Sequence, residues 1–242
     1  MPVNQNAVYN YALDKAMRLH NQGQIEEAVS HYQHLLESNP DSPDLWHLLG
    51  LAAHQKSQHT LAEQLIKTAL SLDKKVPDFH TNLGLVYRAL NRDQEAENCF
   101  RYAIGLNSED SKSLAQLASL LRQKQDYIAA IDYARQAVQA DPKNAEALNN
   151  LGNVEKDIGL TKEAIKSYRL AIDSQPAFAL AHWNLALALL SLGKIEEGFT
   201  EMAWRWKWDK FPGIRRNFSQ PHWNGENLSE CIIYLHPEQG LG

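Results

Sequence analysis

The stretch Glu163–Pro176, "EAIKSYRLAIDSQP", decides the fold, because close variants of it recur along the chain. Three of them read "EEAVSHYQHLLESNP" at Glu26–Pro40, "EAENCFRYAIGLNSED" at Glu95–Asp110 and "AAIDYARQAVQADP" at Ala129–Pro142. They align at a period of 34 residues with no insertion or deletion. A fixed period of this size indicates a fold built from repeated supersecondary units.

Aligned units share small or turn-forming residues at fixed positions. We number positions within units that begin at Tyr9, Pro43, Pro77, Ser111, Ala145 and Ala179. Position 8 is always small: Ala16, Gly50, Gly84, Ala118, Gly152 and Ala186. Position 20 is alanine in five units: Ala28, Ala62, Ala96, Ala130 and Ala164. Position 15 mostly holds residues that tolerate the turn after a helix: Gly23, Ser57, Asn91, Gln125, Gly159 and Gly193.

This pattern predicts a helical hairpin in each unit. At about 100° per residue, positions 4, 7, 8 and 11 lie on one face of a helix, where small residues allow a second helix to approach closely. Proline at position 32 ends the second helix in three units, at Pro40, Pro142 and Pro176. A lone hairpin cannot bury its apolar face, so the units must stack. We therefore predict an all-α, right-handed α-solenoid of about six hairpins over residues 9–208.

The pattern resembles the tetratricopeptide repeat (TPR), and the resemblance covers about residues 9–208. Aromatic residues at the expected positions support it: Tyr32, Trp46, Tyr87, Phe100 and Tyr168. The resemblance implies a protein-interaction module whose first helices line a concave groove.

Composition and charge exclude several classes of function. The chain has 242 residues, 44% of them hydrophobic, and a net charge of -5, which argues against a general nucleic-acid binder. Its two cysteines, Cys99 and Cys231, lack metal-ligand spacing and fit a reducing, cytoplasmic setting. The start of the chain has no features of a secretory signal. Residues 174–193 contain no Asp, Glu, Lys or Arg, but Pro176, His182 and Asn184 interrupt them, so we predict no membrane span.

The concave groove is the expected binding site, and two rows of side chains line it. Position 6 supplies a ladder of amides, which donate and accept at once and suit an extended peptide: Asn82, Gln116, Asn150 and Asn184. Position 12 supplies a basic row that would favour acidic ligands: His20, His54, Arg88, Arg122 and Lys156. The alternative is that the amides are only a solvated polar edge, and Leu48 interrupts the ladder toward the N-terminus.

Catalysis and metal binding are not expected from this region. His47, His54 and His59 lie close in sequence, but their spacing does not provide a tetrahedral metal shell. We interpret them as surface histidines. The sequence therefore predicts no catalytic residues, no metal ligands and no cofactor.

The tryptophan-rich end of the sixth unit predicts an interface. Trp204 and Trp208 would lie about 40° apart on a helix, facing outward, while Trp206 at position 28 would pack back onto the array. An exposed apolar patch marks an interaction site, so we predict self-association through this segment. The alternative is a locally packed aromatic cap folded under "FPGIRRNF".

The remaining residues suggest a junction with another domain. Residues 209–229 would form a linker, and residues 230–242 would form a first strand and glycine loop, as at the start of a doubly wound α/β domain. The junction resembles the one in bacterial proteins where TPR units run into a heptosyltransferase-like glycosyltransferase of GT-B type. The resemblance is carried by Trp204, Arg205, Trp206, Phe211, Pro212, Arg216, Phe218, Pro221, Trp223, Gly225, Glu226, Leu228, His236, Glu238, Gln239, Gly240, Leu241 and Gly242.

Two functions follow as expectations. The resemblance implies a substrate- or partner-recruiting solenoid of a cytoplasmic glycosyltransferase that uses a nucleotide-sugar donor. In that family the aspartate after the glycine loop is implicated as general base, and no residue follows Gly242 here. This chain alone is therefore expected to lack enzyme activity. The alternative is a stand-alone TPR scaffold with a degenerate tail.

Overall fold

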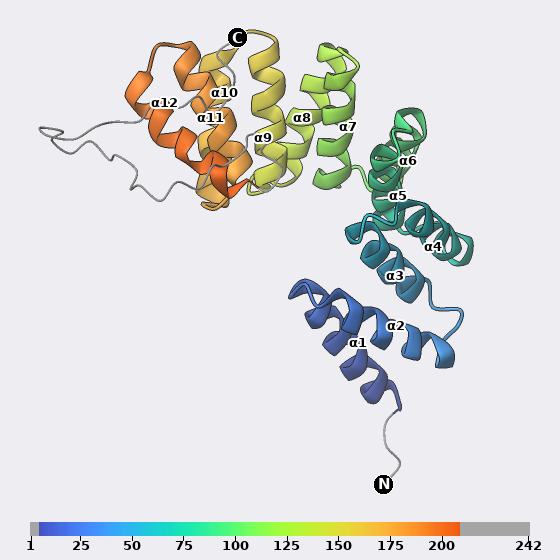
Figure 1. Cartoon of the computed structure of the whole chain (residues 1–242). Helices are drawn as coiled ribbons and strands as arrows, with labels where there is room; N and C mark the ends of the chain where they lie inside the picture. Colours follow the sequence, from blue (N-terminus) through green and yellow to red (C-terminus); the bar gives the residue numbers. More distant parts are fainter. Residues whose placement is uncertain (1–4, 209–242) are drawn as a thin grey trace, which may run out of the picture.

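The computed structural model describes residues 5–208, and these form six stacked helical hairpins (Figure 1). The first helices of the hairpins are α1 (Gln5–Asn21), α3 (Pro43–Gln55), α5 (Pro77–Ala89), α7 (Ser111–Gln123), α9 (Ala145–Asp157) and α11 (Ala179–Ser191). The second helices are α2 (Ile25–Ser38), α4 (His59–Leu72), α6 (Asp93–Leu106), α8 (Tyr127–Ala140), α10 (Thr161–Ser174) and α12 (Ile195–Met202), followed by a 3₁₀ turn, η1 (Ala203–Lys207).

The helices begin at or near the starts of the aligned units. Five first helices begin at the first residue of their unit, and only α1 begins earlier, at Gln5 rather than Tyr9. Proline starts α3 and α5, where its missing N–H costs no hydrogen bond. Within the described residues all regular elements are helical, and the strand predicted within residues 230–242 lies outside them.

The turn inside every hairpin needs a left-handed residue, as position 15 predicted. The three glycines there have φ between 73° and 85°, and Ser57, Asn91 and Gln125 adopt φ of 59–62°. This geometry reverses the chain within three residues, because a left-handed residue caps the preceding helix. The two helices of each unit are thereby held antiparallel and close.

Small residues at position 8 allow the two helices of a unit to pack closely. A Cβ added to Gly84 would lie 2.5 Å from the ring of Phe100, and one added to Gly152 would lie 2.6 Å from Tyr168. In both units the contacting ring belongs to position 24 of the second helix and is fully buried. The alanines at position 20 are also fully buried in all five units that have them.

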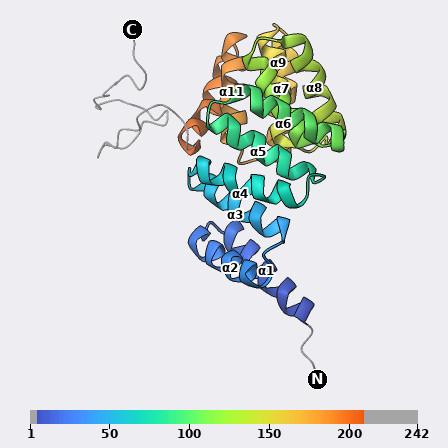
Figure 2. The same ribbon diagram turned by 90° about the vertical axis from the view of Figure 1, so that its right-hand side faces the viewer.

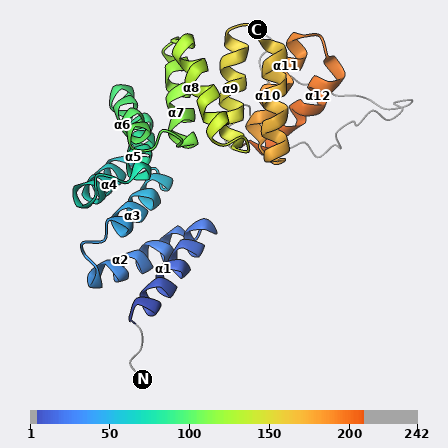
Figure 3. The same cartoon turned by 180° about the vertical axis from the view of Figure 1, so that it is seen from behind.

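The stack is curved, with α1 and α12 at opposite ends (Figures 1 and 3). The view turned by a quarter shows the later units grouped above the earlier ones (Figure 2). Successive first helices contact each other at α3–α5, α7–α9 and α9–α11, and no successive second helices pack to the same extent. The first helices therefore lie on the inner side of the curve, where the sequence placed the groove.

None of the helices among residues 5–208 is long and apolar enough to cross a lipid bilayer. The apolar stretch within residues 174–193 is explained by α11, whose residues Ala181, Leu185 and Ala188 are buried against the preceding unit.

Candidate functional site

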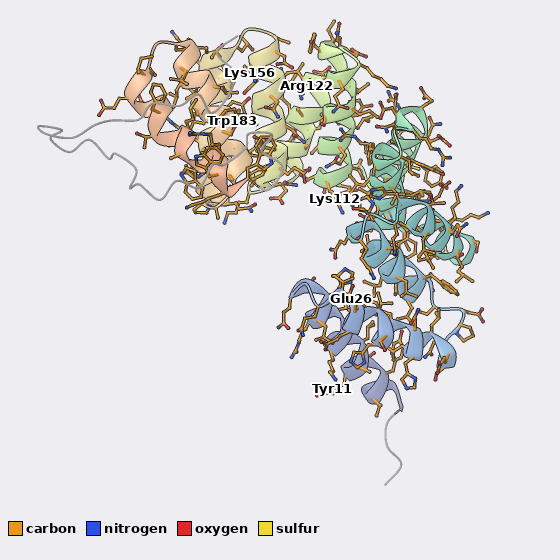
Figure 4. The ribbon with its side chains drawn as sticks, in the orientation of Figure 1. Tyr11, Glu26, Lys112, Arg122, Lys156 and Trp183 are labelled. Carbon is orange, nitrogen blue, oxygen red and sulfur yellow. The ribbon has the colours of Figure 1, made fainter. Side chains whose placement is uncertain are left out.

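The inner surface over α7, α9 and α11 holds most of the predicted groove residues. Figure 4 shows Arg122 and Lys156 near the same end of α7 and α9, and Trp183 on α11. Lys112 lies toward the other end of α7. Cations and an indole thus lie along these three helices, and the contacts of each predicted groove residue decide which polar groups remain available to a ligand.

The position-6 amides connect neighbouring units. The Nδ2 of Asn82 donates to His47 Nε2 at 2.8 Å, and that of Asn184 donates to Asn149 Oδ1 at 2.9 Å. The Nδ2 of Asn150 donates to the Ala115 carbonyl at 3.3 Å. Each partner lies 35 residues earlier, at position 5 of the preceding unit. The amides are therefore structural links between units as well as groove residues, which neither sequence interpretation anticipated.

The four amides differ in how much hydrogen-bonding capacity they retain. Asn82 Oδ1 accepts from Lys112 Nζ at 2.8 Å, so both ends of this amide are engaged. Gln116 is likewise engaged at both ends, through Arg88 and Glu146. By contrast, the carbonyl oxygens of Asn150 and Asn184 accept no hydrogen bond from any described residue. The acceptors left for a ligand are concentrated on α9 and α11.

The position-12 row also links units, in the opposite direction. His20 contacts Gln55, Arg88 donates to Gln123, and Arg122 forms an ion pair with Asp157 at 2.7 Å. Each partner lies 35 residues later, at position 13 of the next unit. Burial lowers the pKa of Arg88, whose guanidinium is held by two glutamine side chains.

Lys156 is the exception in this row. The residue 35 positions after Lys156, at position 13 of the next unit, is Ser191. Its hydroxyl donates to the Ala188 carbonyl at 2.8 Å and not to a residue of the preceding unit. Lys156 is half-buried, and its side chain has no ion pair or hydrogen bond with any other described residue. Among the predicted Arg and Lys side chains, Lys156 is the one with neither an ion pair nor a hydrogen bond to another described residue.

Sequence reasoning missed two groove residues, Lys112 and Trp183. Position 2 is acidic in the neighbouring units, at Asp44, Asp78 and Glu146, so Lys112 reverses the sign there. Trp183 is half-buried at position 5, where the other units carry smaller side chains or histidine. Both residues could have been identified from the aligned units, because each differs in type from the residues at the same position of the other units.

The interpretation of His47 as a surface histidine is wrong. His47 is buried, its ring lies 4.4 Å from that of Phe79, and its Nε2 accepts from Asn82. Burial, with the charge of Lys112 as a second cause, lowers its pKa to about 4. His54 and His59 are half-buried and in contact through their Nδ1 atoms at 3.1 Å. No three potential ligands within residues 5–208 are arranged to hold a metal.

Trp204 does not face outward as the helical pattern predicted. The chain leaves the α-helix after Met202 and continues as a 3₁₀ turn, which changes the angular spacing of the tryptophans. Trp204 is half-buried and stacks on buried His182 of α11, with ring centroids 4.0 Å apart and planes within 4°. The Nζ of Lys207 lies 3.8 Å from the same ring. Trp204 is thus part of a local aromatic cap.

The other tryptophans are half-buried too. The guanidinium of Arg205 lies 4.7 Å from the Trp206 ring. An interface role for Trp204, Trp206 and Trp208 stays a prediction. The predicted linker and strand, residues 209–242, lie outside the described residues.

Comparison with known proteins identifies the family. Models described as "TPR repeat" and "Tetratricopeptide repeat" match residues 18–57 and 43–76, and a further tetratricopeptide repeat model matches residues 81–145, 115–176 and 149–201. The last of these models alone matches half of the chain. The chain therefore belongs to the tetratricopeptide repeat family.

Curated relatives of this chain have varied names. Protein FlbA of Caulobacter vibrioides is 23% identical over 91% of this chain and 37% of its own length. The peroxisomal targeting signal receptor of Saccharomyces cerevisiae is 22% identical over 74% of this chain and 36% of its own. A UDP-N-acetylglucosamine–peptide N-acetylglucosaminyltransferase of Giardia intestinalis is 24% identical over 60% of this chain and 10% of its own length. The chain spans a little over a third of the first two relatives.

Solved structures confirm the fold. The APC/C hetero-tetramer Cut9–Hcn1 superposes with a TM-score of 0.75 at 18% identity, over 81% of this chain and 39% of that one. YrrB, described as a TPR protein with an unusual peptide-binding site, superposes with a TM-score of 0.52 at 22% identity. The superposition covers 76% of this chain and 91% of that one.

Proposed function

We propose that this protein is an interaction module that binds an extended, acidic polypeptide on the inner surface over α9 and α11. The observation that carries the proposal is that two amide oxygens and one ammonium group on these two helices have no hydrogen-bond or ion-pair partner among residues 5–208. The names of the yeast receptor and of the peptide-binding YrrB are consistent with a binding role, but they describe those proteins.

The chemistry of the ligand follows from these groups. The oxygens of Asn150 and Asn184 would accept hydrogen bonds from peptide N–H groups. Lys156 would pair with a carboxylate, either an acidic side chain or the chain end. Trp183 and the exposed Leu187, on the same helix, offer apolar contact. An extended chain advances about 3.3 Å per residue and packed helices lie about 10 Å apart, so successive units meet every third residue or so of a ligand.

A smaller contribution to binding is expected from the other predicted groove residues, which are the amides Asn82 and Gln116 and the cations Arg88 and Arg122. Each neutral hydrogen bond contributes about 0.5–1.5 kcal/mol net, so one amide alone does not dominate binding. A ligand that reaches these residues must exchange contacts that already join units. We therefore expect them to contribute less than the α9–α11 pair, although replacing all four amides should nearly abolish binding.

A peptide array tests the proposal. Dodecapeptides of matched length, half of them acidic and half neutral, are screened, and the best binders are titrated by fluorescence polarisation. We expect acidic peptides to bind, the Asn150→Ala/Asn184→Ala variant to weaken them, and Lys156→Ala to reduce the salt dependence, because exposed charges are screened within about 8 Å at physiological ionic strength.

The matched control is Lys166→Ala, which removes an exposed lysine from α10, outside the groove. Unchanged affinity in the double amide variant, with circular dichroism confirming its fold, would refute peptide recognition by the ladder. The double variant is preferred to the fourfold one, because it removes fewer of the hydrogen bonds that link neighbouring units.

A second candidate is that the module recruits substrates for a linked glycosyltransferase in the cytoplasm. The observation that favours it is the likeness of this chain to relatives named as sugar transferases acting on peptides, together with the junction motif in the sequence. Reading the gene beyond the codon for Gly242 tests it. Alternating strands and helices there support the linkage, and a stop codon leaves the stand-alone scaffold. In both cases we expect the purified chain to transfer no sugar.

A further inference from the structure

Both ring nitrogens of buried His182, on α11, face hydrogen-bond acceptors. Nε2 donates to the Pro176 carbonyl at 3.0 Å, and Nδ1 contacts the Oε2 of Glu201 on α12. A carbonyl and a carboxylate only accept, whereas a neutral imidazole has a single N–H. The second proton belongs to the ring, because an imidazole ordinarily binds a proton more tightly than a carboxylate does. The site therefore fits the doubly protonated, cationic form of His182.

Trp204 of η1 covers this cationic ring. The two rings are parallel, with centroids 4.0 Å apart. Since the imidazole occupies one face of the indole, the Nζ of Lys207, 3.8 Å from the ring centre, lies over the other face. A cation over the face of an indole is stabilising. The contact of η1 with α11 is therefore strongest while His182 is charged.

The third unit contains a matching pair of rings. His80 and Tyr102 stand at positions 4 and 26, as His182 and Trp204 do, and their ring centroids are 4.3 Å apart. The Nε2 of His80 donates at 2.8 Å to the backbone carbonyl six residues earlier, which is also the arrangement in the sixth unit. The repeat thus supplies an internal comparison for the stacked histidine.

The two units differ at position 23. In the third unit this position is Cys99, and the Nδ1 of His80 has no hydrogen-bond partner among residues 5–208. In the sixth unit it is Glu201, which contacts Nδ1 of the ring. One ring proton satisfies His80, whereas His182 needs two. The carboxylate makes a repeated stacking contact dependent on a proton.

Other charged groups lie further from the His182 ring. Lys207 is on the far side of the indole. Three charged residues line the small cavity beside Glu201: Arg169, Glu196 and Glu197. The first and last of them form an ion pair at 2.7 Å. Helices α9 and α10 give the ring no hydrogen bond or ion pair, so within residues 5–208 Glu201 is its charged partner.

We propose that His182, Glu201 and Trp204 form a proton-controlled latch between α11 and η1. When Nδ1 loses its proton as the pH rises, two acceptors face each other at a buried site, which is unfavourable. The cation–π contact with Trp204 is lost at the same step. The latch is closed at low pH, and at higher pH η1 separates from α11 and exposes the indole. Positions 4 and 6 lie on nearly opposite sides of a helix, so the latch is independent of the ligand site at Asn184.

Nuclear magnetic resonance of protein with ¹⁵N-labelled histidine counts the ring protons. The signals of His182 are assigned by their absence in His182→Gln. We expect two ring protons at about pH 6 and one at about pH 9, within the range around which histidine titrates. A single proton at the lower pH, or two at the higher one, overturns the proposal.

The opening of the latch is measured on protein that contains 5-fluorotryptophan. The ¹⁹F resonance of Trp204 is assigned by its absence in Trp204→Phe, and its solvent isotope shift reports exposure to water. We expect this shift to grow from about pH 6 to about pH 9. Glu201→Gln should keep it small at both, because a glutamine amide can donate to a neutral ring as well as accept from a charged one.

The matched control is His80→Gln, which removes the histidine at the same position of the third unit and should leave the response of Trp204 unchanged. Circular dichroism checks that each variant is folded. A purely structural contact would be lost in His182→Gln but would show no dependence on pH. A Trp204 exposure that ignores pH in the wild type, or that rises equally in Glu201→Gln, therefore overturns the latch.

Discussion

At the scale of single residues, the six hairpin turns show how one backbone requirement is met by different side chains. Three units use glycine at position 15, where left-handed φ carries no penalty, while Ser57, Asn91 and Gln125 adopt the same conformation. A non-glycine residue in this region costs about 1–2 kcal/mol, although asparagine tolerates it better. The turn is therefore imposed by the packing of the two helices, which outweighs the local cost.

Replacing Gln125 by glycine should stabilise the protein. The strain relieved exceeds the extra entropy that glycine loses on folding, so we expect a net gain of about 0.5–1 kcal/mol. Urea denaturation followed by circular dichroism measures it. Gln125→Ala provides the control, because alanine keeps the strain and should bring no gain. A loss of stability in Gln125→Gly would show that the glutamine side chain contributes more than its backbone strain costs.

His47 should make the protein sensitive to acid. Its folded pKa of about 4 lies below the ordinary value of 6.5, so the unfolded chain binds more protons between these values. The stabilisation is complete above about pH 6.5 and is lost as the pH falls toward 4. We expect about 2 kcal/mol to be lost by pH 5, at 1.36 kcal/mol per pKa unit.

Urea denaturation at pH 7 and pH 5 measures this loss, and His47→Gln provides the comparison, because an amide there keeps a polar contact with Asn82 but does not titrate. The groups facing His47 are Asn82, Phe79 and, through its charge, Lys112. If both proteins lose equal stability between the two pH values, His47 is not the acid-sensitive group.

At the scale of helices, the close approach within each hairpin depends on position 8. Gly84→Ala should destabilise the protein by about 1–3 kcal/mol, because the added methyl group would overlap the buried ring of Phe100. Thermal and urea denaturation measure the effect. Gly105→Ala is the matched control: nothing lies within 4 Å of its added Cβ, so it should be neutral or slightly stabilising. Equal effects of the two substitutions would contradict a packing role for Gly84.

At the scale of the whole molecule, stability should be highest in the middle of the array. A unit of a solenoid gains most of its stability from its neighbours, and no further unit follows the sixth one within residues 5–208. Its second helix has eight residues instead of fourteen, and Gly198 is its one buried residue. Hydrogen exchange by mass spectrometry should therefore show faster amide exchange in α12 than in α6, α8 or α10. Protection of α12 that equals that of α10 would contradict the expected gradient of stability.

The sequence by itself determined the phase of the repeat. Small residues, alanines and turn residues recur at fixed positions because each reports a local need: close approach, burial or a left-handed turn. Five of the six first helices begin at the residue where the aligned unit begins. Helical periodicity also assigned a face to each position, and from it the side chains of the groove were predicted.

Only the tertiary structure decided what those side chains contact. Asn82 and Arg88 are linked to neighbouring units because the stacking brings together residues 35 apart, a relation that no single helix contains. Burial of His47 depends on Phe79 and Lys112 from later units. Trp204 turned inward because the backbone changed from α to 3₁₀ at Ala203 and brought the indole onto His182. Local sequence sets the faces of the helices, whereas the partners of polar groups are set by distances between units.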